Sequence, residues 1–156
     1  MATAQFTVRD LAQEVVRQMG IHGQNGPKLL EALKGPVQKV LATPDLGTQG
    51  VKREGNHIDN SKYLYWDGQM SITFDHMPKG KFIPPHDHGA CEMLAIYSGK
   101  LKHVVYDRLD DGKKEGFADL KVIDDRVLER NEAAIVAPPS EIHSFTAMTD
   151  DTFVVK

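Results

Sequence analysis

The sequence lacks the features that stabilise secreted or membrane-bound chains. Cys91 is its only cysteine, which excludes an internal disulfide framework and a cysteine-rich zinc module. No apolar run approaches the ~18 residues of a membrane-spanning helix. The apolar pattern near the N-terminus is interrupted by charged residues, unlike the pattern of a signal peptide. We therefore expect a cytoplasmic protein that does not bind a membrane.

The chain also has little excess charge of either sign. It carries 19 Lys and Arg against 22 Asp and Glu, for a net charge of −3, so no basic field favours binding to nucleic acid. Apolar residues make up 40% and charged residues 26%, as in a globular protein. Because 156 residues can bury a sizeable core, we expect a single domain over residues 1–156.

The first third of the chain has helical periodicity. Apolar residues at helical spacing predict a first helix that begins after Thr7 and stops at Gly20. A second helical pattern runs from about Pro27 to Leu41, and we expect Gly35-Pro36 to kink or split it. Residues 1–45 are therefore predicted to form a helical segment that packs on the rest of the domain.

From about Tyr63 the apolar period changes to two, which is typical of strands. Polar turns separate the predicted strands, so the pattern indicates an antiparallel sandwich or small barrel over residues 62–156. The polar stretch Thr43–Ser61 is interpreted as a loop or a lid. The predicted strands are Met70–His76, Met93–Ser98, Leu101–Arg108, Leu120–Leu128, Glu132–Ala137 and Thr152–Val155.

One histidine pair among the seven histidines has the spacing of a metal site. In an extended chain His86 and His88 point to the same face, and Glu92 has the same parity. Two neutral imidazoles and a carboxylate on one face suit a first-row divalent metal. A further ligand must come from elsewhere, and His143, at the start of another predicted strand, is the natural candidate.

The residues around these histidines resemble the two sequence motifs of the cupins. The first motif is matched by Gly80-x5-His86-x-His88-x3-Glu92-x6-Gly99, and the second in part by Pro138-x-Ser140-x2-His143. Cupins are double-stranded β-helices, so the resemblance implies a mainly β, jelly-roll barrel preceded by the two predicted helices. It also suggests a homodimer, because cupins commonly dimerise through sheet edges.

Within the cupins, the chain looks most like thiol dioxygenases of the cysteine dioxygenase type. By this resemblance His86, His88 and His143 would be three iron ligands. Thiol dioxygenases have cysteine or glycine where this chain keeps Glu92. A site of three histidines and one glutamate looks instead like acireductone and flavonol dioxygenases, whose substrates chelate the metal through two oxygens.

These observations lead to the hypothesis of an Fe(II)-dependent dioxygenase that acts on dioxygen and a small polar molecule, either a thiol or an oxygen-chelating compound. Glu92 is either the fourth metal ligand or a general base whose pKa is raised by burial. Two alternatives stay open. With Zn, Ni or Mn the same ligands would serve a non-redox isomerase or lyase, and a binding protein would use the metal only to hold a ligand.

Several other residues carry weaker expectations. Cys91 is expected to face away from the histidines as a small buried hydrophobe, Trp66 to fill the core, and His103 to face solvent on the opposite side from Leu101. Ser140 is either a turn residue or a partner that orients a ligand histidine. The cations nearest the predicted barrel mouth are Arg53, Lys62 and Lys81.

Overall fold

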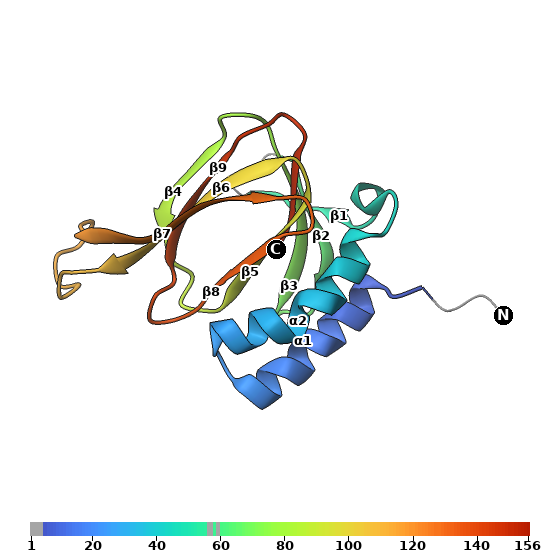
Figure 1. Cartoon of the computed structure of the whole chain (residues 1–156), viewed down its shortest axis with the longest axis horizontal. Coiled ribbons are helices and arrows are strands. Elements are labelled where there is room, and N and C mark those ends of the chain that lie inside the picture. Colours follow the sequence, from blue (N-terminus) through green and yellow to red (C-terminus); the bar gives the residue numbers. More distant parts are fainter. Residues whose placement is uncertain (1–4, 56–57, 59) are drawn as a thin grey trace.

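The computed structural model describes residues 5–55, 58 and 60–156, in which two helices precede two antiparallel β-sheets (Figure 1). The helices are α1 (Val8–His22) and α2 (Gly26–Leu41), followed by a short 3₁₀ turn (Leu46–Thr48). The strands are β1 (Val51–Lys52), β2 (Asn60–Trp66), β3 (Ser71–Met77), β4 (Phe82–His86), β5 (Glu92–Ser98), β6 (Lys100–Arg108), β7 (Leu120–Glu129), β8 (Ala133–Val136), β9 (Ile142–Ala147) and β10 (Thr152–Val155).

The order of strands β3 to β10 is that of a jelly roll. Successive strands divide between two sheets, whose orders are β3-β10-β5-β8 and β4-β9-β6-β7. Strands β1 and β2 extend the first of these sheets beyond β3. Two four-stranded antiparallel sheets connected in this way make two Greek keys, the arrangement found in cupin barrels. The predicted fold class, a mainly β jelly-roll barrel with two N-terminal helices, is therefore confirmed.

Both helices begin close to the predicted residues, but α1 runs further than the sequence suggested and α2 is not split. Thr7 and Asp10 form a reciprocal capping box, and α1 continues past Gly20 to end at Gly23, whose φ of 58° few other residues adopt. Helix α2 runs through Gly35-Pro36 without a break. Its buried apolar face is continuous across the proline, so packing on the barrel outweighs the lost hydrogen bond.

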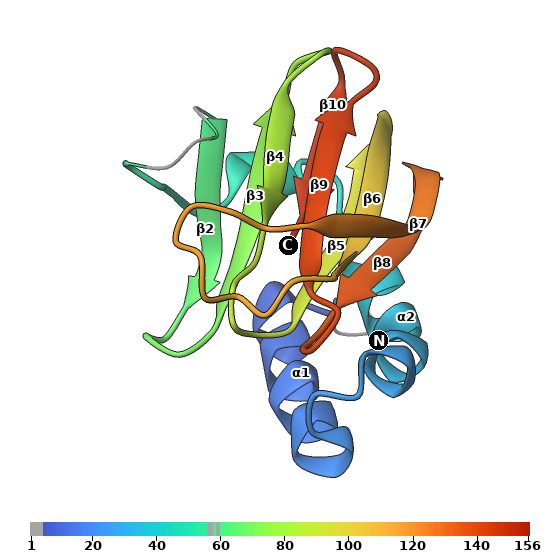
Figure 2. The ribbon, with the colours of Figure 1, turned by 90° about the vertical axis from the view of Figure 1, so that its left-hand side faces the viewer.

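The buried side chains form two layers, separated by the six-stranded sheet. Neighbouring residues of one strand point to opposite sides, so Ala95 and Val155 pack towards the helices, whereas Leu94 and Val154 point between the sheets. Helix α2 contacts β5 and β8, and α1 contacts β2. Both helices lie together on one side of the barrel in Figures 1 and 2. The barrel interior is thus closed on this side by the sheet and not by the helices.

Gly99, the last residue of the first cupin-like motif, joins β5 to β6 where the backbone has no room for a side chain. Its φ is 74°, and a Cβ there would lie 2.7 Å from the Cα of Thr152. The motif glycine is therefore required by a close approach of the chain to the start of β10.

Two expectations about the segments before β3 need revision. Thr43–Ser61 is not a single loop or lid, because its described residues include the 3₁₀ turn, β1 and the first residues of β2. Trp66 does not fill the core: it is 67% exposed at the end of β2, with its ring 6.1 Å from that of Tyr63. Because β2 ends at the surface, the alternation of side chains along this strand does not predict whether its last residue is buried.

Neither helix in the described part of the chain has the length and hydropathy needed to cross a bilayer.

Candidate metal centre

Three predicted metal ligands converge at one end of the barrel. His86 is the last residue of β4, and its Cα is the register partner of the Cα of His143 on β9. Directly opposed residues point to the same face, so both imidazoles enter the interior. The ring centroid of His86 lies 4.6 Å from that of His143 and 4.8 Å from that of His88. One nitrogen from each of the three rings lies within 4.8 Å of the others.

The tautomer of His86 is fixed by its own strand. Its Nδ1 lies 2.7 Å from the carbonyl oxygen of Pro84, which can only accept a hydrogen bond. Nδ1 therefore carries the proton, and Nε2 keeps a lone pair. A hydrogen bond from one ring nitrogen to a backbone carbonyl is the usual way in which proteins orient a metal-binding histidine.

His143 is oriented by a residue whose role the sequence did not reveal. It is fully buried, and its Nδ1 lies 3.0 Å from Nε2 of His103, which is also fully buried. The expectation that His103 faces solvent is wrong, because residues two apart in a strand share a face and His103 follows Leu101 into the interior. Nε2 of His143 has no hydrogen-bond partner among the described residues.

Burial keeps both of these imidazoles neutral. Desolvation lowers the pKa of His143 to about 3, with a further contribution from the neighbouring His86, and it lowers the pKa of His103 to about 4. If Nε2 of His143 holds a cation, its Nδ1–H must donate to Nε2 of His103. His143 would then face the centre as a neutral imidazole with a lone pair on Nε2, the form in which imidazole binds metals.

Glu92, the fourth predicted ligand, contacts one of the three histidines, His88. Its Oε2 lies 2.5 Å from Nε2 of His88, and its buried Oε1 has no partner in the described part of the chain. Because a carboxylate only accepts, Nε2 of His88 carries a proton in this contact. Glu92 therefore orients His88 in this structure.

The expected raised pKa of Glu92 is not found. Burial does raise it, but the hydrogen bond from His88 and the charge of Lys156 outweigh burial and bring the pKa to about 2. The same hydrogen bond raises the pKa of His88. Glu92 is thus an ionised acceptor, and burial alone was an incomplete guide because the hydrogen bond from nearby His88 and the charge of Lys156, which is distant in sequence, both oppose it.

A cavity of about 420 Å³ opens beside this centre. His88 and Glu92 line it together with Thr73 and the side chain of Lys156, and apolar residues of both helices form another part of its wall. Of the predicted mouth cations Arg53 also lines it, whereas Nζ of Lys62 donates to the backbone carbonyl of Gly47. The cavity volume is that of a pocket for a small molecule.

Two further predicted residues behave differently from expectation. Ser140 does not orient a ligand histidine, because its hydroxyl donates to Oδ1 of Asp107 at 2.8 Å. Cys91 is only half-buried and lines the same cavity as His88 and Glu92, so it is not a core residue. It lies in the loop before β5, where strand alternation does not apply. Desolvation raises the pKa of its thiol.

The residues present fit a divalent metal ion. Three imidazoles converge, the hydrogen bond from Nδ1 of His86 leaves a lone pair on its Nε2, and Nε2 of His143 is a buried acceptor that finds no partner among the described residues. Leaving such an atom unpaired is costly unless a ligand satisfies it. Imidazole ligands suit iron, nickel and zinc alike, so the donor set by itself does not select one metal.

No family model matches the chain, and no curated protein matches it. Among solved structures it is similar to KdgF from Halomonas sp. (15% identity, TM-score 0.48, covering 69% of this chain and 84% of that one). It is also similar to a cupin superfamily protein from Desulfitobacterium hafniense (11%, 0.44, 69% and 92%). A cupin 2 conserved barrel domain protein from Leptotrichia buccalis is a third (20%, 0.45, 67% and 41%). Likenesses this remote carry no argument about function, and the fold assignment rests on the strand order.

Proposed function

We propose that this protein is an Fe(II)-dependent dioxygenase of a small polar substrate. The observation that carries the proposal is the convergence of three imidazoles beside a cavity of small-molecule size, one of them with a buried Nε2 that no other described residue contacts through a hydrogen bond. His86, His88 and His143 would hold the iron, and iron bound there would supply the redox-active centre that dioxygen chemistry needs.

The protein groups around the histidines hold them in a single binding geometry. Pro84 and His103 fix the ring orientations of His86 and His143, and Glu92 does the same for His88. Ligands that are already oriented lose little entropy when the metal and the substrate bind. The substrate and dioxygen are then brought together in the cavity, which replaces a collision of separate molecules by a fixed arrangement.

Glu92 has a second function in this proposal. Its Oε1 is buried at the cavity wall and receives no hydrogen bond from the described residues, so it is placed to accept one from a hydroxyl or thiol of the substrate. With a pKa of about 2, it orients that group more effectively than it removes its proton. Both substrate classes considered above, thiols and oxygen chelators, offer such a donor.

The reaction class makes a strict demand on stoichiometry. When both oxygen atoms of dioxygen end in the product, the substrate supplies all the electrons and no external reductant is consumed. We therefore expect Fe(II)-loaded protein to take up one dioxygen per substrate without added reductant. Oxygen-electrode measurements against a panel of thiols, β-dicarbonyls and α-hydroxyketones test this.

Matched histidine variants show whether uptake depends on this centre. His143→Gln should lose both bound iron and uptake, whereas His76→Gln, which alters a histidine bonded to the carbonyl of Asp150, should keep both. Full iron retention in the His143 variant contradicts the proposed centre. Turnover that continues under strict anaerobiosis contradicts the dioxygenase and supports a non-redox isomerase or lyase, and retained ligand without turnover supports a binding protein.

A further inference from the structure

We propose that the ammonium of Lys156 is an anion-binding group of the cavity, so that the substrate is a small molecule with a negatively charged group such as a carboxylate. To call the bound anion a substrate rests on the proposed function. The anion site itself does not depend on iron or dioxygen. It comes from a buried lysine that shares the cavity with the candidate metal centre.

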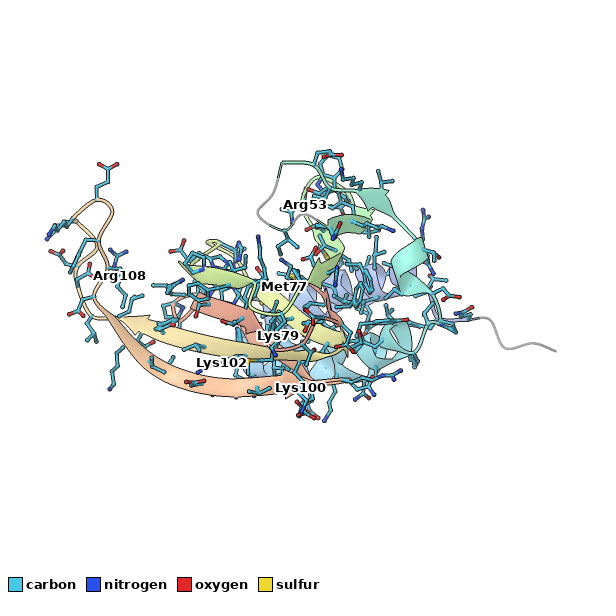
Figure 3. All side chains as sticks on the ribbon, turned by 90° about the horizontal axis from the view of Figure 1, so that it is seen from above. Arg53, Met77, Lys79, Lys100, Lys102 and Arg108 are labelled. Carbon is cyan, nitrogen blue, oxygen red and sulfur yellow. The ribbon has the colours of Figure 1, made fainter. Side chains whose placement is uncertain are left out.

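Lys156 lies inside the barrel. It has the same parity as Val154 of β10, which points between the sheets, and its side chain is only 15% exposed. Figures 1 and 2, two perpendicular views, both place this end of the described chain near the middle of the molecule. By contrast, the lysines labelled in Figure 3 lie on β6 and in the loop before β4 and are at least partly exposed.

One aromatic ring connects the ammonium with the histidines. Nζ of Lys156 lies 5.7 Å from the ring centroid of Phe145, and this ring lies 5.6 Å from that of His143 and 5.9 Å from that of His86. Lys156, His88 and Glu92 also line the same cavity. A molecule that binds at the histidines is therefore close to this positive charge.

The hydrogen bonds of Asp75 leave part of this ammonium available. Nζ of Lys156 donates to Oδ2 of Asp75 at 2.8 Å, and the described residues offer it no second acceptor. The buried carboxylate is shared with two hydroxyl donors, because Ser61 donates to Oδ1 at 2.5 Å and Thr73 to Oδ2 at 3.3 Å. An ammonium has three N–H donors, so two remain for another partner.

The charges of the interior favour an anion. Asp75 and Glu92 each contribute −1 and Lys156 contributes +1, and the three imidazoles contribute nothing once they bind a metal, because an imidazole must be neutral to act as a ligand. A divalent cation on the histidines makes the total +1, and one singly charged anion makes it neutral. In a site of low dielectric constant a neutral total is strongly favoured.

A simpler interpretation is that the Asp75–Lys156 pair only joins β3 to β10, whose backbones pair at Thr73 and Lys156. The two interpretations predict different effects on ligand binding in the cavity. A purely structural pair changes stability when it is altered, whereas an anion-binding group changes the affinity for anions and not for neutral analogues of equal size.

The first measurement compares two probes on Co(II)-loaded protein by the thiolate absorption that binding produces. Mercaptoacetate and 2-mercaptoethanol share a thiol but differ in the carboxylate. We expect the wild type to bind mercaptoacetate about 10-fold more tightly or better, as a charged hydrogen bond would give. The double variant Asp75→Asn/Lys156→Met, which leaves no unpaired buried charge, should bind both thiols alike and keep its affinity for 2-mercaptoethanol.

Two other variants identify the cation responsible. Lys81→Met, outside the cavity lining, should preserve the preference for mercaptoacetate. Arg53 lines the cavity, so Arg53→Gln tests the rival cation. A preference that survives the double variant, or that disappears only with Arg53→Gln, overturns the assignment to Lys156.

The second measurement needs neither iron nor dioxygen. Acetate added to Zn(II)-loaded protein, whose interior charge totals +1, should shift the NMR signals of the Thr73 and Lys156 amides in a saturable way, and should not do so in the double variant. Absence of this shift in the wild type overturns the anion site even if dioxygen uptake occurs. Conversely, acetate binding without dioxygen uptake against any substrate would contradict only the dioxygenase.

Discussion

The two ends of the barrel interior are built from the same strands but have opposite chemistry. On β9 the inward residue His143 is followed two positions later by Phe145, and on β5 Glu92 is followed by Leu94. At one end the side chains are hydrocarbon and closely packed, and at the other they are polar and include unpaired atoms. Two residues along a strand are enough to separate the polar end of the interior from the apolar end.

This difference indicates how the protein tolerates an unsatisfied centre. Buried polar atoms without partners, such as Nε2 of His143 and Oε1 of Glu92, each cost stability. The apolar end and the helix-covered layer supply the burial that offsets this cost. We expect substitutions at the apolar end to change stability, and those at the polar end to change binding.

The largest expected effect is at the apolar end. Leu94 is fully buried, so Leu94→Ala should lower the free energy of unfolding by about 2–5 kcal/mol through lost burial and the cavity that remains. Urea unfolding measures this change. The same substitution at Leu109, which is 61% exposed, should cost less than about 0.5 kcal/mol. A similar cost at both positions would mean that the apolar end is not the stabilising region.

The next effect is at the polar end. His103→Phe keeps an aromatic ring but removes the acceptor for Nδ1 of His143, so metal affinity should fall about 10- to 100-fold. Titration of metal-free protein with Fe(II) or Co(II) by calorimetry measures it. His76→Phe, at a histidine outside the metal-ligand group, should bind metal as the wild type does. Unchanged affinity in the His103 variant would mean that His143 needs no such partner.

The smallest effect is the pH dependence of the metal-free protein. The pKa values of His143 and His103 are lowered to about 3 and 4, so near pH 6 both are neutral when folded but partly protonated when unfolded. At these two groups the unfolded state then binds more protons, which should lower stability by about 1 kcal/mol from pH 7 to pH 6, and the raised pKa of His88 offsets part of this loss. Urea unfolding at both pH values in the presence of a chelator measures this loss.

A variant separates the contributions of the two histidines. His103→Phe removes one titrating group, so it should lose about half of the dependence on pH, whereas Leu94→Ala should keep all of it. An unaltered dependence in His103→Phe would assign the effect to other groups.

Much of the fold could be predicted from local patterns. Strand β10 has the predicted bounds, and β6 begins only one residue before the prediction. Strand β4 was missed because Pro84-Pro85 lies within it and obscures the alternation. Prolines are tolerated there because β4 is an edge strand, where a missing N–H breaks no sheet ladder.

The candidate site was predicted where its residues lie close together in sequence. His86, His88 and Glu92 follow from spacing, and His143 was added from its place at the start of another predicted strand and then supported by the motif resemblance. His103 contacts His143 across the register of β6 and β9, 40 residues apart in the chain, and Lys156 meets Asp75 across β10 and β3. These contacts join strands that are far apart in sequence, so the periodicity of a single segment cannot predict them.

The sequence by itself determined the alternation of the strands, the capped start of the first helix and the shared face of His86 and His88, because each depends on neighbours a few residues away. The tertiary structure decided that Nδ1 of His143 meets Nε2 of His103, that the pKa of Glu92 is lowered, and that Lys156 joins the cavity. These properties depend on burial and on charges brought from distant strands, which exist only once the two sheets have closed on each other.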